Sequence, residues 1–107
     1  MTEPLDVLAI MAHPDDAELL CGGSLAKSSS EGQRVGVLDL TRGEKGSSGS
    51  REIRAKEASN ASAILGLSVR QNAGLPDASL INDSQAKQIV VELIRELRPQ
   101  AVVTHSL

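Results

Sequence analysis

The sequence contains no phenylalanine, tryptophan or tyrosine among its 107 residues. A core must therefore be built from leucine, isoleucine, valine, alanine and methionine. The absence of aromatic rings also argues against binding to single-stranded nucleic acid, because the bases stack on such rings. The net charge of -3 gives no basic surface of the kind that binds polyanions. We therefore expect no nucleic-acid partner.

Cysteine and long apolar runs are equally scarce. Cys21 is the only cysteine, so an internal disulfide is impossible and a reducing compartment is indicated. We interpret it as a small buried hydrophobic residue. No stretch approaches the ~20 apolar residues of a membrane span, and residues 1–4 lack the basic and apolar regions of a signal peptide. These features predict a cytoplasmic protein with no membrane partner.

Apolar runs alternate with helix-like segments along the whole chain. Strands are expected at 5–11, 34–40, 69–72 and 101–104, and helices at 17–29, 50–65 and between the cap at 82–84 and Pro99. This order predicts a single α/β domain over residues 1–107, with a mostly parallel sheet and right-handed crossovers.

Two features qualify this pattern. Gly22 and Gly23 lie inside the first expected helix, where each costs about 1 kcal/mol relative to alanine. We therefore expect close backbone packing at this pair. Residues 74–77, Gly-Leu-Pro-Asp, predict a turn after the third strand.

The segment 11–16, Met-Ala-His-Pro-Asp-Asp, holds a histidine and two carboxylates where the first strand gives way to a helix. The residue before a proline is extended, and proline is tolerated in a first helical turn. His13 should therefore end the strand, and Asp15 and Asp16 should start the helix, where the helix dipole favours negative charge. Nitrogen and oxygen ligands suit zinc, and a catalytic zinc usually has three protein ligands and an open position. Spacing alone suggests His13 and Asp16 as ligands and Asp15 as a base, but a helix cap and a hydrogen-bonded histidine fit as well.

Other candidate residues follow the second and fourth strands, at the same expected edge of the sheet. The Gly/Ser-rich segment 41–50 is either a loop that covers a substrate or a plain surface loop. It contains neither GxxxxGK[ST] nor GxGxxG, so it gives little support to nucleotide binding. His105 is either a third metal ligand or an ordinary residue at the end of a strand.

Arg54 lies near the start of the second expected helix, close to the same edge. It shares one helical face with three small or apolar residues, Ala58, Ala61 and Leu65. Arg54 either pairs with a buried carboxylate such as Glu57 or binds an anionic substrate, and its position favours neither. Segment 41–54 holds four basic and two acidic residues, which leans toward an acidic substrate.

Four groups of residues lie in order along the chain: 12–16 with Glu18 and 21–25, then 39–44, 51–58 and 72–77. Together they resemble the motifs of the LmbE-like or PIG-L family, the zinc-dependent N-acetylglucosaminyl deacetylases. The branch they resemble most is the bacillithiol-biosynthesis deacetylase, which removes acetate from N-acetylglucosaminyl malate. The resemblance implies a Rossmann-like three-layer sandwich, a small-molecule amino-sugar substrate and a homo-oligomer.

By position, the resemblance makes His13 and Asp16 ligands of Zn²⁺, Asp15 the general base and Arg54 a substrate-binding residue. The family's third zinc ligand lies in a histidine motif beyond the strand that ends at Thr104. Members of the family are about twice as long as this chain. We therefore expect this chain to be the N-terminal half of the family domain. The alternative is a non-catalytic Rossmann-like module that binds a sugar or a metal, because two ligands rarely hold zinc tightly.

Overall fold

The computed structural model describes residues 3–13, 16–42, 51–75 and 84–104, without the side chains of residues 18–20, 51 and 54. Strands and helices alternate through these residues, in the order that the sequence predicted. The elements are β1 (Val7–Met11), α1 (Asp16–Ser30), β2 (Val35–Thr41), α2 (Arg51–Leu65), β3 (Val69–Leu75), α3 (Ser84–Leu97) and β4 (Ala101–Thr104).

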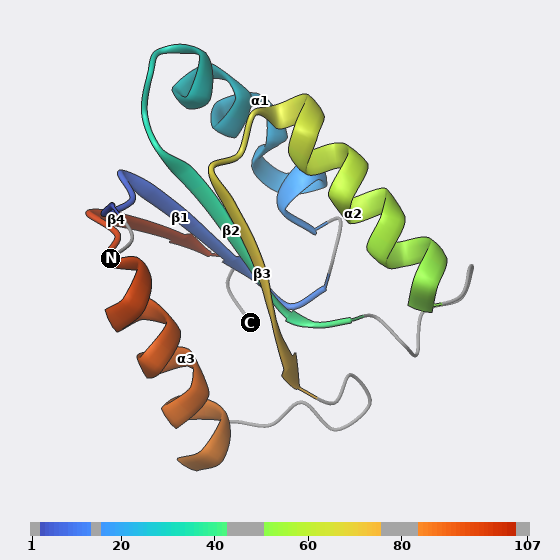
Figure 1. Cartoon of the computed structure of the whole chain (residues 1–107), viewed down its shortest axis with the longest axis vertical. Coiled ribbons are helices and arrows are strands. Elements are labelled where there is room, and N and C mark those ends of the chain that lie inside the picture. Colours follow the sequence, from blue (N-terminus) through green and yellow to red (C-terminus); the bar gives the residue numbers. More distant parts are fainter. Residues whose placement is uncertain (1–2, 14–15, 43–50, 76–83, 105–107) are drawn as a thin grey trace.

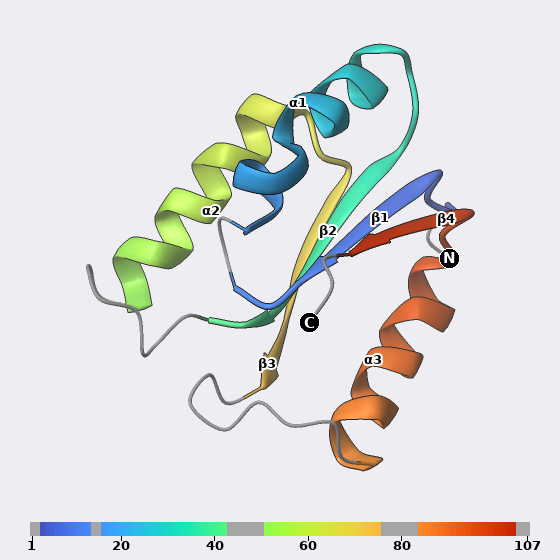
Figure 2. The same ribbon diagram turned by 180° about the vertical axis from the view of Figure 1, so that it is seen from behind.

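The four strands form one parallel sheet in the order β3-β2-β1-β4. Helices α1 and α2 lie together on one face of the sheet, and α3 covers the other face (Figures 1 and 2). This is the α/β three-layer arrangement that was expected. None of the three described helices combines the length and the apolar character that a bilayer crossing requires.

Each face of the sheet has its own aliphatic core, because successive side chains of a strand point to opposite faces. On β2, Val35 and Val37 belong to a cluster that packs against α1, whereas Leu38 belongs to a cluster that packs against α3. The α1 cluster consists of Ala9, Met11, Ala17, Leu25, Val35 and Val37, and the α3 cluster of Leu5, Leu8, Leu38 and Leu97.

Helix α1 is interrupted at Cys21, whose backbone angles of φ -146° and ψ 19° are not helical. Cys21 is partly buried and packs against the α1 core cluster, as a small hydrophobic residue would. Among the described residues, no atom lies within 4 Å of the place that a Cβ would take at Gly22 or Gly23. Within the described part of the chain, the expected close packing at this pair is therefore not found. The glycines follow a break in the helix and do not occupy the middle of an uninterrupted one.

Strand β3 is longer than the sequence predicted, since it continues to Leu75. Gly74, with φ +71°, lies within this strand and not in the expected turn. Residues 76 and 77 lie outside the described residues. The pairing of β2 with β3 is irregular between Asp39 and Thr41. This irregularity lies close to the carboxyl ends of both strands, where the candidate site is found.

The strand order reverses beside β1. The chain passes from β1 to β2 and β3 on one side, and then places β4 on the other side of β1. In parallel α/β sheets, ligands bind outside the carboxyl ends of the strands at such a switch point. His13 lies two residues beyond the end of β1 and therefore at this point.

Candidate functional site

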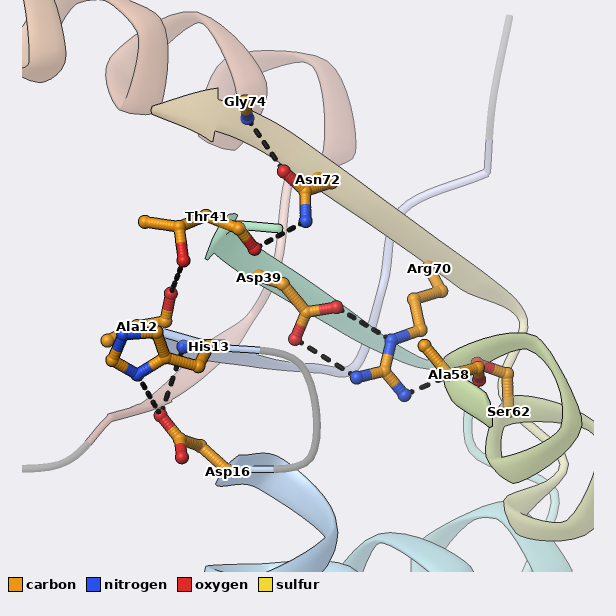
Figure 3. A network of polar contacts seen from close by, with 10 residues as sticks. All are labelled: Ala12, His13, Asp16, Asp39, Thr41, Ala58, Ser62, Arg70, Asn72 and Gly74. Atoms are coloured by element: carbon orange, nitrogen blue, oxygen red, sulfur yellow. Dashed lines mark hydrogen bonds and ion pairs between the residues drawn. The ribbon is translucent and has the colours of Figure 1, made fainter. Parts of the chain in front are cut away.

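The side chains of His13 and Asp16 point toward each other in the turn between β1 and α1 (Figure 3). The backbone N–H of His13 donates a hydrogen bond to Asp16 Oδ2 at 3.0 Å, and His13 Nδ1 lies 3.5 Å from the same oxygen. The backbone N–H of Asp16 donates to the His13 carbonyl at 3.2 Å. The turn therefore brings an imidazole nitrogen and a carboxylate oxygen together, as the spacing predicted.

This pair fits two ligands of one zinc ion. Ligand atoms at ~2.0–2.1 Å from a tetrahedral zinc lie about 3.3 Å apart, and the Nδ1 to Oδ2 distance is 3.5 Å. The side chains are 42% and 27% exposed, so a small molecule can reach them. No group of three or more histidine, cysteine or acidic side chains within the described ranges could hold a metal ion. The described residues thus provide two donors, and the roles of His13 and Asp16 as ligands stay predictions.

Hydrogen bonds tie the carboxyl ends of three strands together beside this pair (Figure 3). The Thr41 N–H and the Thr41 hydroxyl both donate to the Ala12 carbonyl, each at 3.0 Å. The Asn72 amide donates to the Thr41 carbonyl at 2.6 Å, and the Gly74 N–H donates to Asn72 Oδ1 at 2.8 Å. The family resemblance of the sequence placed Thr41 and Asn72 in motifs but gave them no function. The structure shows that they connect β2 and β3 to the residue before His13.

A buried ion pair lies on the α2 side of the sheet, between Asp39 on β2 and Arg70 on β3. Arg70 donates from Nε to Asp39 Oδ2 at 2.8 Å and from Nη2 to Oδ1 at 3.0 Å. Sequence reasoning missed this pair. The signal was an acidic residue in an otherwise apolar strand, on the face that also carries Val35 and Val37.

The other predicted site residues are only partly covered by the structure. Asp15, His105 and most of the Gly/Ser-rich loop lie outside the described residues. Arg54 is the fourth residue of α2, and its side chain is not described. Glu57 is exposed, so it is wrong as a buried partner for Arg54. In the described part of the chain, the buried arginine–carboxylate pair is formed by Arg70 and Asp39 instead.

A pocket of about 540 Å³ lies between α2 and strands β2 and β3. Its described lining carries two arginines and two acidic residues, so no charge of one sign dominates. The pocket by itself therefore points to no ionic ligand. Its lining residues are Asp39, Arg42, Glu52, Ala55, Ala58, Ser59, Ser62, Arg70, Gln71 and Asn72.

Comparison with known protein families gives a match that covers nearly the whole sheet and the candidate site. The model of the PIG-L family, described as GlcNAc-PI de-N-acetylase, matches residues 8–107. The chain belongs to the PIG-L family. The matched residues include the turn that carries His13 and Asp16, at the switch point of the sheet.

Individual proteins that are similar to this chain agree with the assignment. The mycothiol S-conjugate amidase of Streptomyces coelicolor is 31% identical, over 98% of this chain and 45% of its own. The crystal structure of the conserved protein TT1542 from Thermus thermophilus is 49% identical, with a TM-score of 0.87, over 92% of this chain and 44% of that one. The N,N'-diacetylchitobiose deacetylase from Pyrococcus horikoshii is 27% identical, with a TM-score of 0.84, over 90% of this chain and 39% of its own. The chain therefore spans less than half the length of each of these proteins.

Proposed function

We propose that this chain carries the N-terminal part of a zinc-dependent N-deacetylase that removes the acetyl group from an N-acetylglucosamine-containing small molecule. The observation that carries the proposal is the convergence of His13 Nδ1 and Asp16 Oδ2, 3.5 Å apart, beside the switch point of a PIG-L sheet. Two relatives whose names describe an amidase and a deacetylase support the reaction class.

The proposed roles follow from the chemistry of the side chains. His13 and Asp16 would hold the zinc ion through nitrogen and oxygen donors. A zinc ion supplies a Lewis acid and a water that ionises near neutral pH. Asp15 would accept the proton of the attacking water and return it to the departing amine. Arg54 would bind a carboxylate or a sugar oxygen of the substrate.

For the substrate itself, we propose N-acetylglucosaminyl malate, the precursor in bacillithiol biosynthesis. The excess of basic residues in segment 41–54 supports an acidic substrate. Two of the named relatives are described by other molecules, a mycothiol S-conjugate and N,N'-diacetylchitobiose. This choice is therefore tested against an inositol-linked N-acetylglucosamine and N,N'-diacetylchitobiose. A cytoplasmic location and a homo-oligomer belong to the same proposal, supported by the single cysteine and by the family resemblance.

The experiment measures acetate release from these three compounds, with zinc content determined on the same samples. We expect turnover by a zinc-loaded full-length version of the protein, highest with the malate conjugate. Asp15→Asn should lower kcat by at least ~100-fold, because general acid–base catalysis contributes about that much, and should leave zinc content unchanged. Glu31→Gln is the matched control, since it neutralises an exposed carboxylate just after α1, at the opposite end of the strands, and should leave turnover unchanged.

Two results would count against the proposal. Full activity of the Asp15→Asn variant would remove Asp15 as the base. A full-length version that folds but neither binds zinc nor releases acetate would favour the second candidate, a module that binds sugar without turnover. The finding of two metal donors among the described residues favours that candidate. It predicts saturable binding of N-acetylglucosamine to the metal-free chain.

A further inference from the structure

We propose that Thr41 is a positioning residue for the candidate ligands His13 and Asp16, acting through the peptide group between Ala12 and His13. The inference rests on the proposed function, because it assigns a role within the same site. It is carried by three hydrogen bonds that converge on one peptide unit. Figure 3 shows the bond of the Thr41 hydroxyl and that of the His13 N–H.

The two polar atoms of this peptide unit are held from opposite sides. The Ala12 oxygen accepts the Thr41 N–H and the Thr41 hydroxyl, each at 3.0 Å. The His13 N–H, on the other side of the same unit, donates to Asp16 Oδ2 at 3.0 Å. Because the peptide unit is planar, a rotation that moved its oxygen would also move its N–H. Thr41 therefore fixes the donor that orients the Asp16 carboxylate and the backbone that carries the imidazole.

The Thr41 hydroxyl contributes more than one further bond between two strands. A carbonyl oxygen has two lone pairs, and the backbone N–H of Thr41 already engages the Ala12 oxygen. The hydroxyl provides a second donor to this oxygen, which fixes the peptide plane more strictly than one bond can. Thr41 is completely buried, and a β-branched side chain has few rotamers, so its hydroxyl is held in place.

Asn72 extends this support to β3. Its amide donates to the Thr41 carbonyl at 2.6 Å, and its oxygen accepts the Gly74 N–H at 2.8 Å. The position of Thr41 is thus set from the side opposite to Ala12. Partners of this kind, which orient metal ligands without touching the metal, typically contribute about 10–100-fold to metal affinity.

The chain offers a matched control in Thr104. Its hydroxyl donates to the Ile10 carbonyl at 2.7 Å, so β1 receives the same kind of bond from β4. The Thr104→Val variant removes the hydrogen bond that this hydroxyl donates to β1, but it leaves the peptide between Ala12 and His13 untouched. At position 41 itself, Thr41→Val removes the hydroxyl, whereas Thr41→Ser changes the side chain but keeps the hydroxyl.

The test measures amide hydrogen exchange in the metal-free chain, with the His13 amide compared against the core amide of Leu38. Thr41→Val should speed exchange at His13 by about three- to tenfold, the effect of losing one hydrogen bond, and leave Leu38 unchanged. Thr41→Ser should restore the slow exchange, and Thr104→Val should not affect His13. Competition with a chelator should show zinc affinity about tenfold lower in Thr41→Val.

Other outcomes are equally decisive. Equal acceleration at His13 and Leu38 would assign Thr41 to global stability alone and overturn the proposal, as would unchanged exchange at His13. Faster exchange at His13 in Thr104→Val would also overturn the proposal. It would mean that losing any side-chain bond to β1 loosens His13, whether or not the bond reaches the peptide between Ala12 and His13. If no variant binds zinc, the proposed metal chemistry fails in this chain, while the exchange of the metal-free protein still decides the role of Thr41.

Discussion

Arg70 holds Asp39 through two parallel hydrogen bonds of 2.8 and 3.0 Å, and the two side chains are only 11% and 3% exposed. A third donor, Arg70 Nη1, lies 3.4 Å from the Ser62 hydroxyl, which itself donates to the Ala58 carbonyl. The pair joins β2 to β3 and, through Ser62, to α2. It therefore links the sheet to this helix on the face that holds the pocket.

Removing one partner of this pair should be strongly destabilising. Asp39→Asn leaves the Arg70 charge buried without its counter-charge, and such changes cost about 3–5 kcal/mol. The free energy of unfolding in urea measures the loss. The double variant Asp39→Leu with Arg70→Met should recover most of it, because well-packed apolar residues often replace a buried ion pair without loss. A cost below about 1 kcal/mol for Asp39→Asn would show that water reaches the pair.

Leu97 should be the main contribution of α3 to the core. It is 1% exposed and packs with Leu5, Leu8 and Leu38 on the face of the sheet that α3 covers. Leu97→Ala should cost about 2–5 kcal/mol, from lost burial and the cavity that remains. Ile64→Ala is the control, because Ile64 is 84% exposed on α2 and its loss should change stability by about 0.5 kcal/mol or less. Equal costs for the two variants would contradict the packing of α3 described above.

Alanine substitutions at Gly66 and Gly32 distinguish the cost of a strained backbone from the cost of a steric clash. Both have positive φ, +71° and +89°, but a Cβ at Gly66 would lie 2.5 Å from Ser29 Oγ, whereas nothing described lies within 4 Å at Gly32. Gly32→Ala should cost about 1–2 kcal/mol, the penalty of the left-handed conformation. Gly66→Ala should cost more, because it also displaces the Ser29 hydroxyl, which donates to the Gly66 carbonyl at 2.7 Å. Thermal unfolding measures both.

Adding Ser29→Ala to Gly66→Ala should recover part of that extra cost, since it removes the obstructing oxygen. If Gly66→Ala is no worse than Gly32→Ala, the junction of α1 and α2 adjusts without resistance. That result would mean that this hydrogen bond contributes little to the contact between the two helices.

Zinc should stabilise the folded chain through His13. A ligand that binds only the native state raises the free energy of unfolding by about 2.7 kcal/mol when its concentration is 100 Kd. Zinc should therefore raise the Tm, and a chelator should reverse the increase. His13→Ala should abolish the increase. Cys21→Ala should preserve it, because the thiol in the break of α1 has no part in the proposed site. A shift that survives in His13→Ala but disappears in Cys21→Ala would place the metal at the cysteine.

Local sequence was sufficient for much of the fold and for one turn of the site. The alternation of apolar runs and helix-like segments predicted the order of the elements in the described residues, because each depends on the spacing of neighbouring residues. Proline between His13 and the aspartates predicted that the strand would give way to a helix and that imidazole and carboxylate would converge. These residues are three positions apart, so the local backbone alone brings them together.

Contacts between distant segments were decided only by the tertiary structure. Thr41 meets Ala12 across 29 positions, and Arg70 meets Asp39 across 31. Neither pair shows in spacing, because both depend on which strands become neighbours and on their register. The glycine pair in α1 shows the same limit, since its surroundings depend on how the helix breaks at Cys21. The local sequence was enough to place His13 and Asp16 together at the edge of the sheet. The packing of β2 and β3 beside β1 decided what holds them there.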